Sequence, residues 1–324
     1  MVEDCNNGAK CDSCTCGDEV LPKKQYFYSE IFSSIQGEGT YTGRNTLWLR
    51  FFLCNLNCNG FGQKNPKDPS TYVLPYENLD VSQYKTIEDL PVFEYGCDSS
   101  YSWAKKFKHL QRKGTAVDIC NAIQNMNKTE YNPEGVFKNP HSRTYSHMCF
   151  TGGEPLLKHG QQCFVEMMEY WNSQNNRPLN ITFETNGTQA LTLETKALMT
   201  KYSTTEFFFS VSPKLFSVSG ERAGKAIKPE VVADYCNYGS GQLKFVINGT
   251  KESWDEMENS ITKFRDVGVH YPVWIMGVGA TVEGQKGELE GHMSVGDIAD
   301  EAIKRGYNVS ARVHCYIWDN VIGK

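Results

Sequence analysis

An alternation of apolar strands and amphipathic helices, from residue 115 onward, restricts the fold of this chain more than any other feature. Residues 115–127 carry apolar side chains at helical spacing and are predicted to form a helix with Cys120 on its buried face. Residues 147–151 are predicted to form a strand, and the next helix is predicted to place Cys163 and Trp171 in the core. Repeated strand–helix units predict an α/β fold with a parallel sheet and right-handed crossovers.

Polar residues follow the apolar strands at the points where the strands end. Further strands are predicted over residues 26–35, 46–53, 180–187, 206–214, 242–247, 272–277 and 308–318, and further helices over 254–264 and 294–306. The polar residues at strand ends are Cys54, Gly152, Glu184, Ser212 and His314. Active sites of β/α barrels lie at the carboxyl ends of the strands, so one shared mouth is expected to bring these residues together.

Three cysteines, Cys54, Cys58 and Cys97, form the first candidate metal site. Three thiolates can bind three irons of a 4Fe–4S cluster and leave the fourth iron open to the amino and carboxylate groups of S-adenosylmethionine. Two cysteines four residues apart also fit the alternative of small apolar side chains in a core. The run Thr151-Gly-Gly-Glu-Pro155 directly after a strand favours the iron–sulfur cluster once both stretches are considered together.

Two further features indicate a ligand at the strand ends. The run Gln36-Gly-Glu-Gly39 follows the first strand, and its glycines allow the backbone to turn tightly and to approach a ligand. An ordinary turn is the alternative for this short run. Arg50 lies within an apolar strand, and a buried guanidinium needs an anionic partner, which is either a structural carboxylate or a bound one.

The length and net charge of the chain limit the number of domains and the classes of function. The 324 residues suffice for one large domain or two small ones, and the formal charge of -5 does not favour nonspecific nucleic-acid binding. No apolar stretch is long enough to span a bilayer, and the first residues lack the features of a signal peptide, so a cytoplasmic protein is expected. In that compartment the twelve cysteines are expected to be reduced thiols and metal ligands.

Two segments fall outside the regular alternation. Residues 1–22 are polar, and the cysteines Cys5, Cys11, Cys14 and Cys16 have a spacing that can bind zinc or a second cluster. A disordered tail is favoured because the segment lacks apolar residues to fold around. Residues 59–96 are rich in Asn, Pro, Asp, Lys and Tyr and are predicted to be an insertion within a single domain of residues 23–324.

Several motifs together resemble the radical S-adenosylmethionine enzymes and, among them, the 7-carboxy-7-deazaguanine synthase family. The motifs are Ser29-Glu-Ile-Phe32, Gln36-Gly-Glu-Gly39, Arg50-Phe-Phe-Leu-Cys54, Cys97-Asp-Ser99, Thr151-Gly-Gly-Glu-Pro155, Glu184-Thr-Asn-Gly187, Ser210-Val-Ser-Pro-Lys214 and Arg312-Val-His314. In this resemblance the Gln-Gly-Glu-Gly and Ser-Pro-Lys runs separate the family from other radical enzymes, which the Gly-Gly-Glu run alone does not.

The resemblance implies an incomplete β/α barrel, of a partial TIM type with insertions, that is usually a homodimer. The implied enzyme is a carbon–nitrogen lyase that converts 6-carboxy-5,6,7,8-tetrahydropterin to 7-carboxy-7-deazaguanine with release of ammonia, in deazapurine synthesis for queuosine in tRNA or for DNA modification. The implied cofactors are a 4Fe–4S cluster, S-adenosylmethionine and Mg²⁺. The reduced cluster is expected to cleave S-adenosylmethionine to a 5'-deoxyadenosyl radical, which takes a hydrogen from the pterin. A flavodoxin or ferredoxin is the implied reductant.

Carried onto this chain, the resemblance assigns roles to individual residues. Cys54, Cys58 and Cys97 are expected to bind the cluster; Cys97 is chosen because Asp-Ser-Ser-Tyr-Ser-Trp follows it, whereas position 61, where the family has its third cysteine, is Phe. Ser99 replaces the family's threonine as the Mg²⁺ ligand and keeps a hydroxyl oxygen. The implied cofactor-binding residues are Gly96, Asp98, Gly152, Gly153, Glu154, Glu184, Ser212, Pro213 and Lys214. The implied substrate-binding residues are Gln36, Gly37, Glu38, Arg50, Thr151 and His314.

Three other functions stay open on the sequence. An activase of a glycyl-radical protein would share the cluster and the Gly-Gly-Glu run, but would not need Gln36, Glu38 and Arg50 as a pocket for a small anion. A noncatalytic zinc protein would use the cysteines of residues 1–22 together with Cys54 and Cys58. A catalytically inactive descendant would act on another protein, and the intact set of motifs argues against it.

Overall fold

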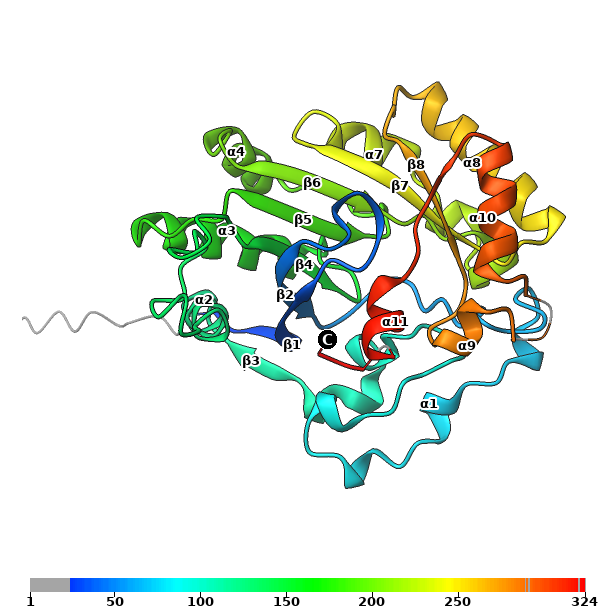
Figure 1. Ribbon diagram of the computed structural model, residues 1–324, viewed down its shortest axis with the longest axis horizontal. Helices are drawn as coiled ribbons and strands as arrows, with labels where there is room; N and C mark the ends of the chain where they lie inside the picture. The colour runs from blue at the N-terminus through cyan, green and yellow to red at the C-terminus, as the bar shows by residue number, and fades with distance from the viewer. Residues whose placement is uncertain (1–23, 289, 291, 320, 324) are drawn as a thin grey trace, which may run out of the picture.

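The computed structural model describes residues 24–288, 290, 292–319 and 321–323. Within these residues nine strands form one sheet in the order β3-β1-β2-β4-β5-β6-β7-β8-β9 (Figure 1). The strands are β1 (Tyr26–Ile35), β2 (Asn45–Phe51), β3 (Arg112–Gly114), β4 (His147–Gly152), β5 (Asn180–Thr185), β6 (Glu206–Val211), β7 (Ser240–Ile247), β8 (Val273–Gly277) and β9 (Asn308–Val309). The predicted cysteine-containing tail lies outside the described residues.

The predicted parallel sheet is confirmed from β2 onward. Each neighbouring pair from β2–β4 to β8–β9 is parallel, whereas β1 pairs antiparallel with both β2 and β3. The sheet is curved, and its outermost strands β3 and β9 lie at opposite ends of the strand order (Figure 1). The chain therefore has a mixed α/β fold around one open sheet.

Helices cover the outer side of the curved sheet (Figure 1). The long ones are α2 (Ala116–Met126), α3 (Lys158–Ser173), α4 (Leu193–Lys201), α7 (Pro229–Tyr235), α8 (Lys251–Asp266) and α10 (Val295–Lys304). The short ones are α1 (Pro75–Asn78), α5 (Phe216–Ser219), α6 (Ala223–Ala226), α9 (Val282–Gln285) and α11 (Val313–Trp318). Among the described residues, no helix has the length and apolar character needed to cross a membrane.

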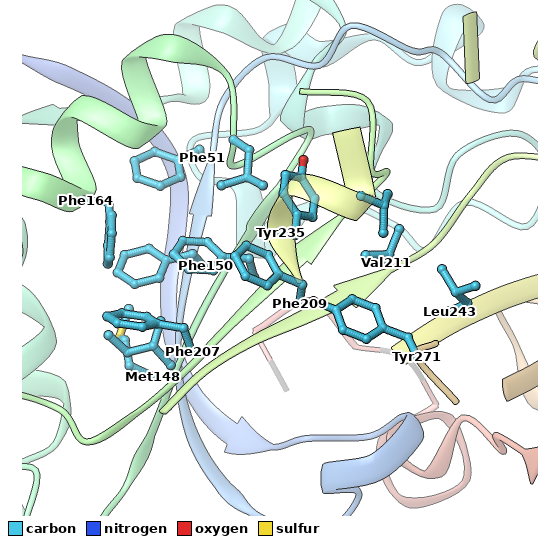
Figure 2. Close-up of a cluster of buried hydrophobic side chains, with 14 of the residues drawn as sticks. Phe51, Met148, Phe150, Phe164, Phe207, Phe209, Val211, Tyr235, Leu243 and Tyr271 are labelled. Carbon is cyan, nitrogen blue, oxygen red and sulfur yellow. The ribbon is translucent and has the colours of Figure 1, made fainter. Parts of the chain in front are cut away.

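A row of stacked aromatic rings holds the central strands in register. Phe150 of β4 stacks on Phe183 of β5 at 5.4 Å between ring centroids, and Phe183 stacks on Phe209 of β6 at 5.6 Å. Phe51 of β2 extends the row at 6.3 Å from Phe150, and α3 packs against it through Phe164 (Figure 2). These rings point toward the helices. Because side chains alternate along a strand, the residue next to each ring points to the opposite, inner face.

The same alternation fixes the polar inner face. Arg50 precedes Phe51, Thr151 follows Phe150, Glu184 follows Phe183, and Lys244 precedes the buried Phe245. The predicted burial of Cys120 and Cys163 among the helices is confirmed, since both are at most 1% exposed. These two thiols belong to the core rather than to the inner face.

Residues 308–318 were predicted to form one long strand, and the structure differs from this prediction. Only Asn308 and Val309 pair with β8, and α11 begins at Val313. The reason lies in the partners of the intervening residues. Ser310 accepts a hydrogen bond from the N–H of Gly39, and Val313 donates its N–H to Gly37. The N–H of Ser310 still donates to Ile275 of β8, but the N–H of Val313 is taken by the turn after β1, and His314 lies on α11.

Residues 59–110 form a strand-free excursion with a small core of its own, beside the sheet (Figure 1). Tyr76, Phe93 and Phe107 are buried in that core. Besides α1, the excursion contains the 3-10 helices Pro69–Thr71, Val81–Gln83, Ile87–Asp89, Ser100–Ser102 and Lys105–Leu110; another, Gly39–Tyr41, follows β1. Cys97 lies within this excursion and packs beside Cys54 and Cys58, so the folding of the excursion decides where this thiol lies.

Candidate active site

One cavity of about 290 Å³ lies at the carboxyl ends of the parallel strands. All but two of the residues expected to bind metal, cofactor or substrate line it, namely Gln36, Gly37, Glu38, Arg50, Cys54, Cys58, Gly96, Cys97, Asp98, Ser99, Thr151, Gly152, Gly153, Glu184, Ser212, Lys214 and His314. Glu154 and Pro213 are absent from its lining. The residues at the strand ends, which were expected to lie together, therefore line one cavity.

Three buried or half-buried thiols lie at one end of the cavity. Burial, with a contribution from the charge of Glu154, raises the pKa of Cys54 to about 12. Burial also raises the pKa of Cys58 and of Cys97. All three side chains are therefore neutral thiols near pH 7 when no metal is bound. Iron binding would require each to lose its proton, because the thiolate is the metal ligand.

The donor set fits an iron–sulfur cluster better than a single ion. Within the described residues, no group of three or more His, Cys, Asp or Glu side chains converges closely enough to hold one metal ion. A 4Fe–4S cluster makes a different demand, because each cysteine binds a different iron. Cys54, Cys58 and Cys97 face the same cavity and are close enough for the charge of one to raise the pKa of another. Their sulfur chemistry fits this cluster.

Gly152 and Gly153 let the end of β4 approach the segment that carries Cys54. A Cβ atom at Gly153 would lie 2.2 Å from the carbonyl oxygen of Leu53. A Cβ atom at Gly152, where φ is +145°, would lie 2.4 Å from the carbonyl oxygen of Phe51. Side chains at either position would therefore push the cysteine segment away from the strand end. Close packing alone explains why glycine is needed here.

Glu154 turns away from the cavity and organises the strand ends. Its side chain is fully buried, and its carboxylate accepts hydrogen bonds from the N–H groups of Leu156 and Asn186 and from the hydroxyl of Thr185. Asn186 in turn donates its side-chain N–H to Asn55, beside Cys54. Glu154 thus links β5 to the cysteine segment through hydrogen bonds.

At the other end of the cavity, Lys244 bridges two carboxylates. Its Nζ lies 2.5 Å from Glu38 and 3.0 Å from Glu184, and its side chain is only 4% exposed. Gln36 donates an amide N–H to the other oxygen of Glu184 at 3.0 Å. Burial opposes the charge of Glu38, but Lys244 and Arg312 hold its pKa well below the usual range. The buried ammonium group and the two carboxylates therefore remain charged because they pair with one another.

Arg312, just before α11, connects the C-terminal segment to Asp98 at the cysteine end of the cavity. Its guanidinium lies 3.1 Å from Glu38 and 2.6 Å from Asp98, and it donates a further hydrogen bond to the carbonyl of Gly279. Burial tends to raise the pKa of Asp98, but Arg312 lowers it below its ordinary value. Asp98, next to Cys97, is thus an anchored carboxylate.

Arg50 has the structural carboxylate that its burial requires. Its Nε donates to Glu30 at 2.6 Å, and the hydroxyl of Tyr101 donates to the same oxygen at 2.9 Å. Among the described residues, the terminal nitrogens Nη1 and Nη2 have no hydrogen-bond partner, and the side chain lines the cavity. The guanidinium can therefore bind an anion in the cavity while Glu30 holds its inner edge.

His314 closes the cavity beside Gly37, where an added Cβ would lie 2.0 Å from its Nδ1. Burial, together with the charge of Arg312, lowers the pKa of His314 to about 4. The ring is therefore neutral at physiological pH and can offer one donor and one acceptor.

Sequence reasoning missed Lys244, and it used Glu30, Tyr101 and Arg312 only as members of motifs, without a role of their own. A usable signal existed for Lys244. Like Arg50, it is a charged residue within an apolar strand, and its neighbour Phe245 shows which face it takes. No comparable local signal marks Tyr101, because the folding of residues 59–110 brings it to Glu30.

Comparison with known proteins finds related sequences over parts of the chain. No family model matches. One segment of 41 residues is 51% identical to a 7-carboxy-7-deazaguanine synthase from Methanothermobacter thermautotrophicus, and 132 residues are 31% identical to one from Methanocaldococcus jannaschii. These segments cover 13% and 41% of this chain, and only 17% and 37% of the relatives. The chain thus resembles 7-carboxy-7-deazaguanine synthases.

Among solved structures, the crystal structure of QueE from Escherichia coli matches with a TM-score of 0.49 at 16% identity, over 90% of this chain and 95% of that chain.

Proposed function

We propose that this protein is a radical S-adenosylmethionine lyase that contracts the ring of 6-carboxy-5,6,7,8-tetrahydropterin to 7-carboxy-7-deazaguanine with release of ammonia. One observation carries the proposal: three thiols and an ionic pocket with an incompletely bonded guanidinium share one cavity. The sequence resemblance to 7-carboxy-7-deazaguanine synthases supports it.

The thiol end is assigned to the cofactors. Cys54, Cys58 and Cys97 are the proposed ligands of a 4Fe–4S cluster, and the hydroxyl of Ser99 is the proposed Mg²⁺ ligand. Bound together, the cluster and S-adenosylmethionine would supply hydrogen-atom abstraction from the substrate. The proposed cofactor-binding residues are Gly96, Asp98, Gly152, Gly153, Glu184, Ser212 and Lys214, all of which line the cavity. Glu154 and Pro213 would act from behind the lining, by holding these strand ends in place.

The ionic end is assigned to the pterin. Arg50 would bind the 6-carboxylate through its two terminal nitrogens, whose planar geometry matches a carboxylate. Glu38 would accept hydrogen bonds from the donor edge of the pterin, with Gln36 and Thr151 beside it. Lys244 would keep Glu38 ionised and in place, because it neutralises a carboxylate that burial would otherwise protonate. Gly37 and His314 would complete this wall of the pocket.

The proposed setting follows the resemblance. A partial barrel of residues 23–324, with residues 59–96 inserted, would act as a cytoplasmic homodimer. It would receive electrons from a flavodoxin or ferredoxin and supply deazapurine synthesis for queuosine or DNA modification. An activase of a glycyl-radical protein is less well supported, because its reaction gives no role to the charged pocket around Lys244 and Arg50.

The test is an anaerobic reaction. The protein, reconstituted with iron and sulfide, is incubated with reductant, Mg²⁺, S-adenosylmethionine and 6-carboxy-tetrahydropterin, and the products are identified by mass spectrometry. Formation of 7-carboxy-7-deazaguanine supports the proposal. Formation of 5'-deoxyadenosine alone would leave the radical chemistry standing and refute the substrate, and binding of zinc without iron or sulfide would refute both.

A further inference from the structure

The segment Leu53–Cys58 has an unusual backbone that must be held from outside. Leu53 has a φ of 87° and Cys58 a φ of 52°, a left-handed conformation that costs free energy in residues other than glycine. The first end of the segment is held by backbone contacts, since Leu53 donates its N–H to Ser102 and accepts the N–H of Glu154. The Cys58 end is held differently, by a side chain.

Glu221 holds the Cys58 end. One of its carboxylate oxygens accepts the N–H of Asn57 at 2.6 Å and the N–H of Cys58 at 3.0 Å. The residue is 9% exposed, and its other oxygen pairs with the half-exposed Lys225 at 3.3 Å. Gly60 adds a backbone hydrogen bond to Ser219, so the chain on both sides of Cys58 rests on the segment that precedes α6.

The segment carrying Glu221 is anchored away from the cavity. The first N–H groups of α5, from Phe216 and Ser217, donate to the carboxylate of Glu256 on α8 at 2.7 and 2.8 Å. Gly220, with a φ of 74°, then turns the chain so that Glu221 meets the Cys58 segment. Glu221 itself is not part of the cavity lining. The contact between α5 and α8 therefore fixes the position of Glu221, which reaches Cys58 from the side that faces away from the cavity.

We propose that Glu221 is a positioning residue for Cys58 and that its negative charge lowers the reduction potential of the iron–sulfur cluster. This inference rests on the proposed function for the presence of the cluster. Net charge and hydrogen bonds to the sulfurs are the main means by which a protein sets such a potential. The carboxylate acts through both, because it adds a negative charge behind Cys58 and engages two N–H groups that could otherwise point at sulfur. Lys225 offsets part of that charge.

The first test uses two substitutions with opposite expected signs. Glu221→Gln keeps an oxygen that can accept the two N–H groups but removes the charge, so the midpoint potential should rise, with the reduction equilibrium favoured roughly three- to tenfold. Lys225→Gln leaves the carboxylate without its cation and should lower the potential by a smaller amount. Potentials are read by redox titration followed by electron paramagnetic resonance. Lys251→Gln, in an exposed ion pair with Asp255, is the matched control and should leave the potential unchanged.

Shifts of the same sign in both variants, or none in Glu221→Gln, would overturn the electrostatic part of the proposal. The positioning part has a test without metal. In the cluster-free protein, Glu221→Ala should speed alkylation of Cys58 relative to Cys97, while Glu221→Asp restores most of the protection. Equal alkylation in all three proteins overturns it. Should the wild-type protein assemble no cluster, the proposed function fails, and the alkylation test still decides whether Glu221 positions Cys58.

Discussion

The two ends of the cavity satisfy their polar groups in opposite ways. At the ionic end, Lys244 and Arg312 pair with the carboxylates of Glu38, Glu184 and Asp98, so each of these charges has a partner of opposite sign within the chain. At the thiol end, burial outweighs the nearby positive charge of Lys214 and keeps the three cysteines neutral. The ionic pocket is therefore formed within the chain, whereas the thiol end would be completed by the proposed cluster.

This difference predicts how substitutions at each end affect folding stability and metal binding. A buried ion network that loses one member leaves a charge without a partner, so its substitutions should reduce folding stability. Neutral buried thiols behave as small apolar side chains, so their substitutions should cost little stability and should abolish metal binding. Stability and iron content therefore separate the two ends experimentally.

The largest expected effect is at the thiol end. Cys97→Ala should abolish assembly of the 4Fe–4S cluster, because only two of the three thiolate ligands remain. Iron and sulfide content after anaerobic reconstitution measures it. Cys120→Ala, at a buried thiol in the helix layer, is the matched control and should keep the full iron content. Normal cluster assembly in Cys97→Ala would show that another residue is the third ligand.

At the ionic end, Lys244→Met should lower the free energy of unfolding by about 3–5 kcal/mol, because it leaves Glu38 and Glu184 buried without their cation. Urea unfolding of the cluster-free protein measures the change. Lys251→Met, in the exposed pair with Asp255, should cost less than about 1 kcal/mol. Similar losses in the two variants would contradict the account of a buried network.

The same variant has a pH signature. In the wild type, Glu38 has a lowered pKa, so its contribution to stability is present above the carboxylate pKa of the unfolded chain and is lost only as the pH falls through the folded value. In Lys244→Met the pKa of Glu38 should rise, because burial then acts without the opposing charge of Lys244, and protonation of Glu38 should relieve its burial. The loss of stability should therefore be smaller at about pH 5 than at about pH 8. A loss that does not depend on pH would indicate a packing effect.

A smaller effect is expected at Arg50. Arg50→Lys keeps the charge but loses the planar pair of terminal nitrogens, so affinity for the 6-carboxypterin should fall roughly 10- to 100-fold. Binding of a pterin that lacks the 6-carboxylate should be the same in both proteins, which serves as the control. An equal loss for both ligands would mean that the substitution has disturbed the pocket through Glu30 instead.

The smallest effect is expected at His314. Its pKa of about 4 keeps the ring neutral, so His314→Gln should change kcat/KM by no more than several-fold, and neither protein should show a step near the ordinary histidine pKa of about 6.5. A pH–rate profile of both proteins measures this. Loss of such a step in the variant would mean that His314 titrates during the reaction.

How far the sequence predicts this molecule depends on the range of the interactions involved. The strands β4 to β8 and the helices α3, α8 and α10 are predicted because each carries its own apolar pattern, whereas α4 and α7 are not predicted. The motif residues at strand ends converge because parallel strands end at one edge. The prediction of one strand over 308–318 is wrong, since the hydroxyl of Ser310 and the N–H of Val313 have partners in the turn after β1, more than 270 positions away. No local pattern contains that contact.

The same reasoning applies to the site. Arg50 was found because a charge within an apolar strand is a local signal, and Lys244 carries the same signal but was overlooked. Tyr101 and Glu221 could not have been found in this way. Tyr101 depends on the packing of residues 59–110, and Glu221 depends on the anchoring of α5 by Glu256. Residues that hold other residues in place become visible only in three dimensions.

The most direct test of the account is transfer of hydrogen between the two ends of the cavity. The reconstituted protein is incubated with S-adenosylmethionine and with 6-carboxy-tetrahydropterin that carries deuterium on its reduced ring. The account predicts that deuterium appears in 5'-deoxyadenosine as 7-carboxy-7-deazaguanine forms. Formation of 5'-deoxyadenosine without deuterium and without the deazaguanine would contradict it, because the two ends would then not serve one reaction.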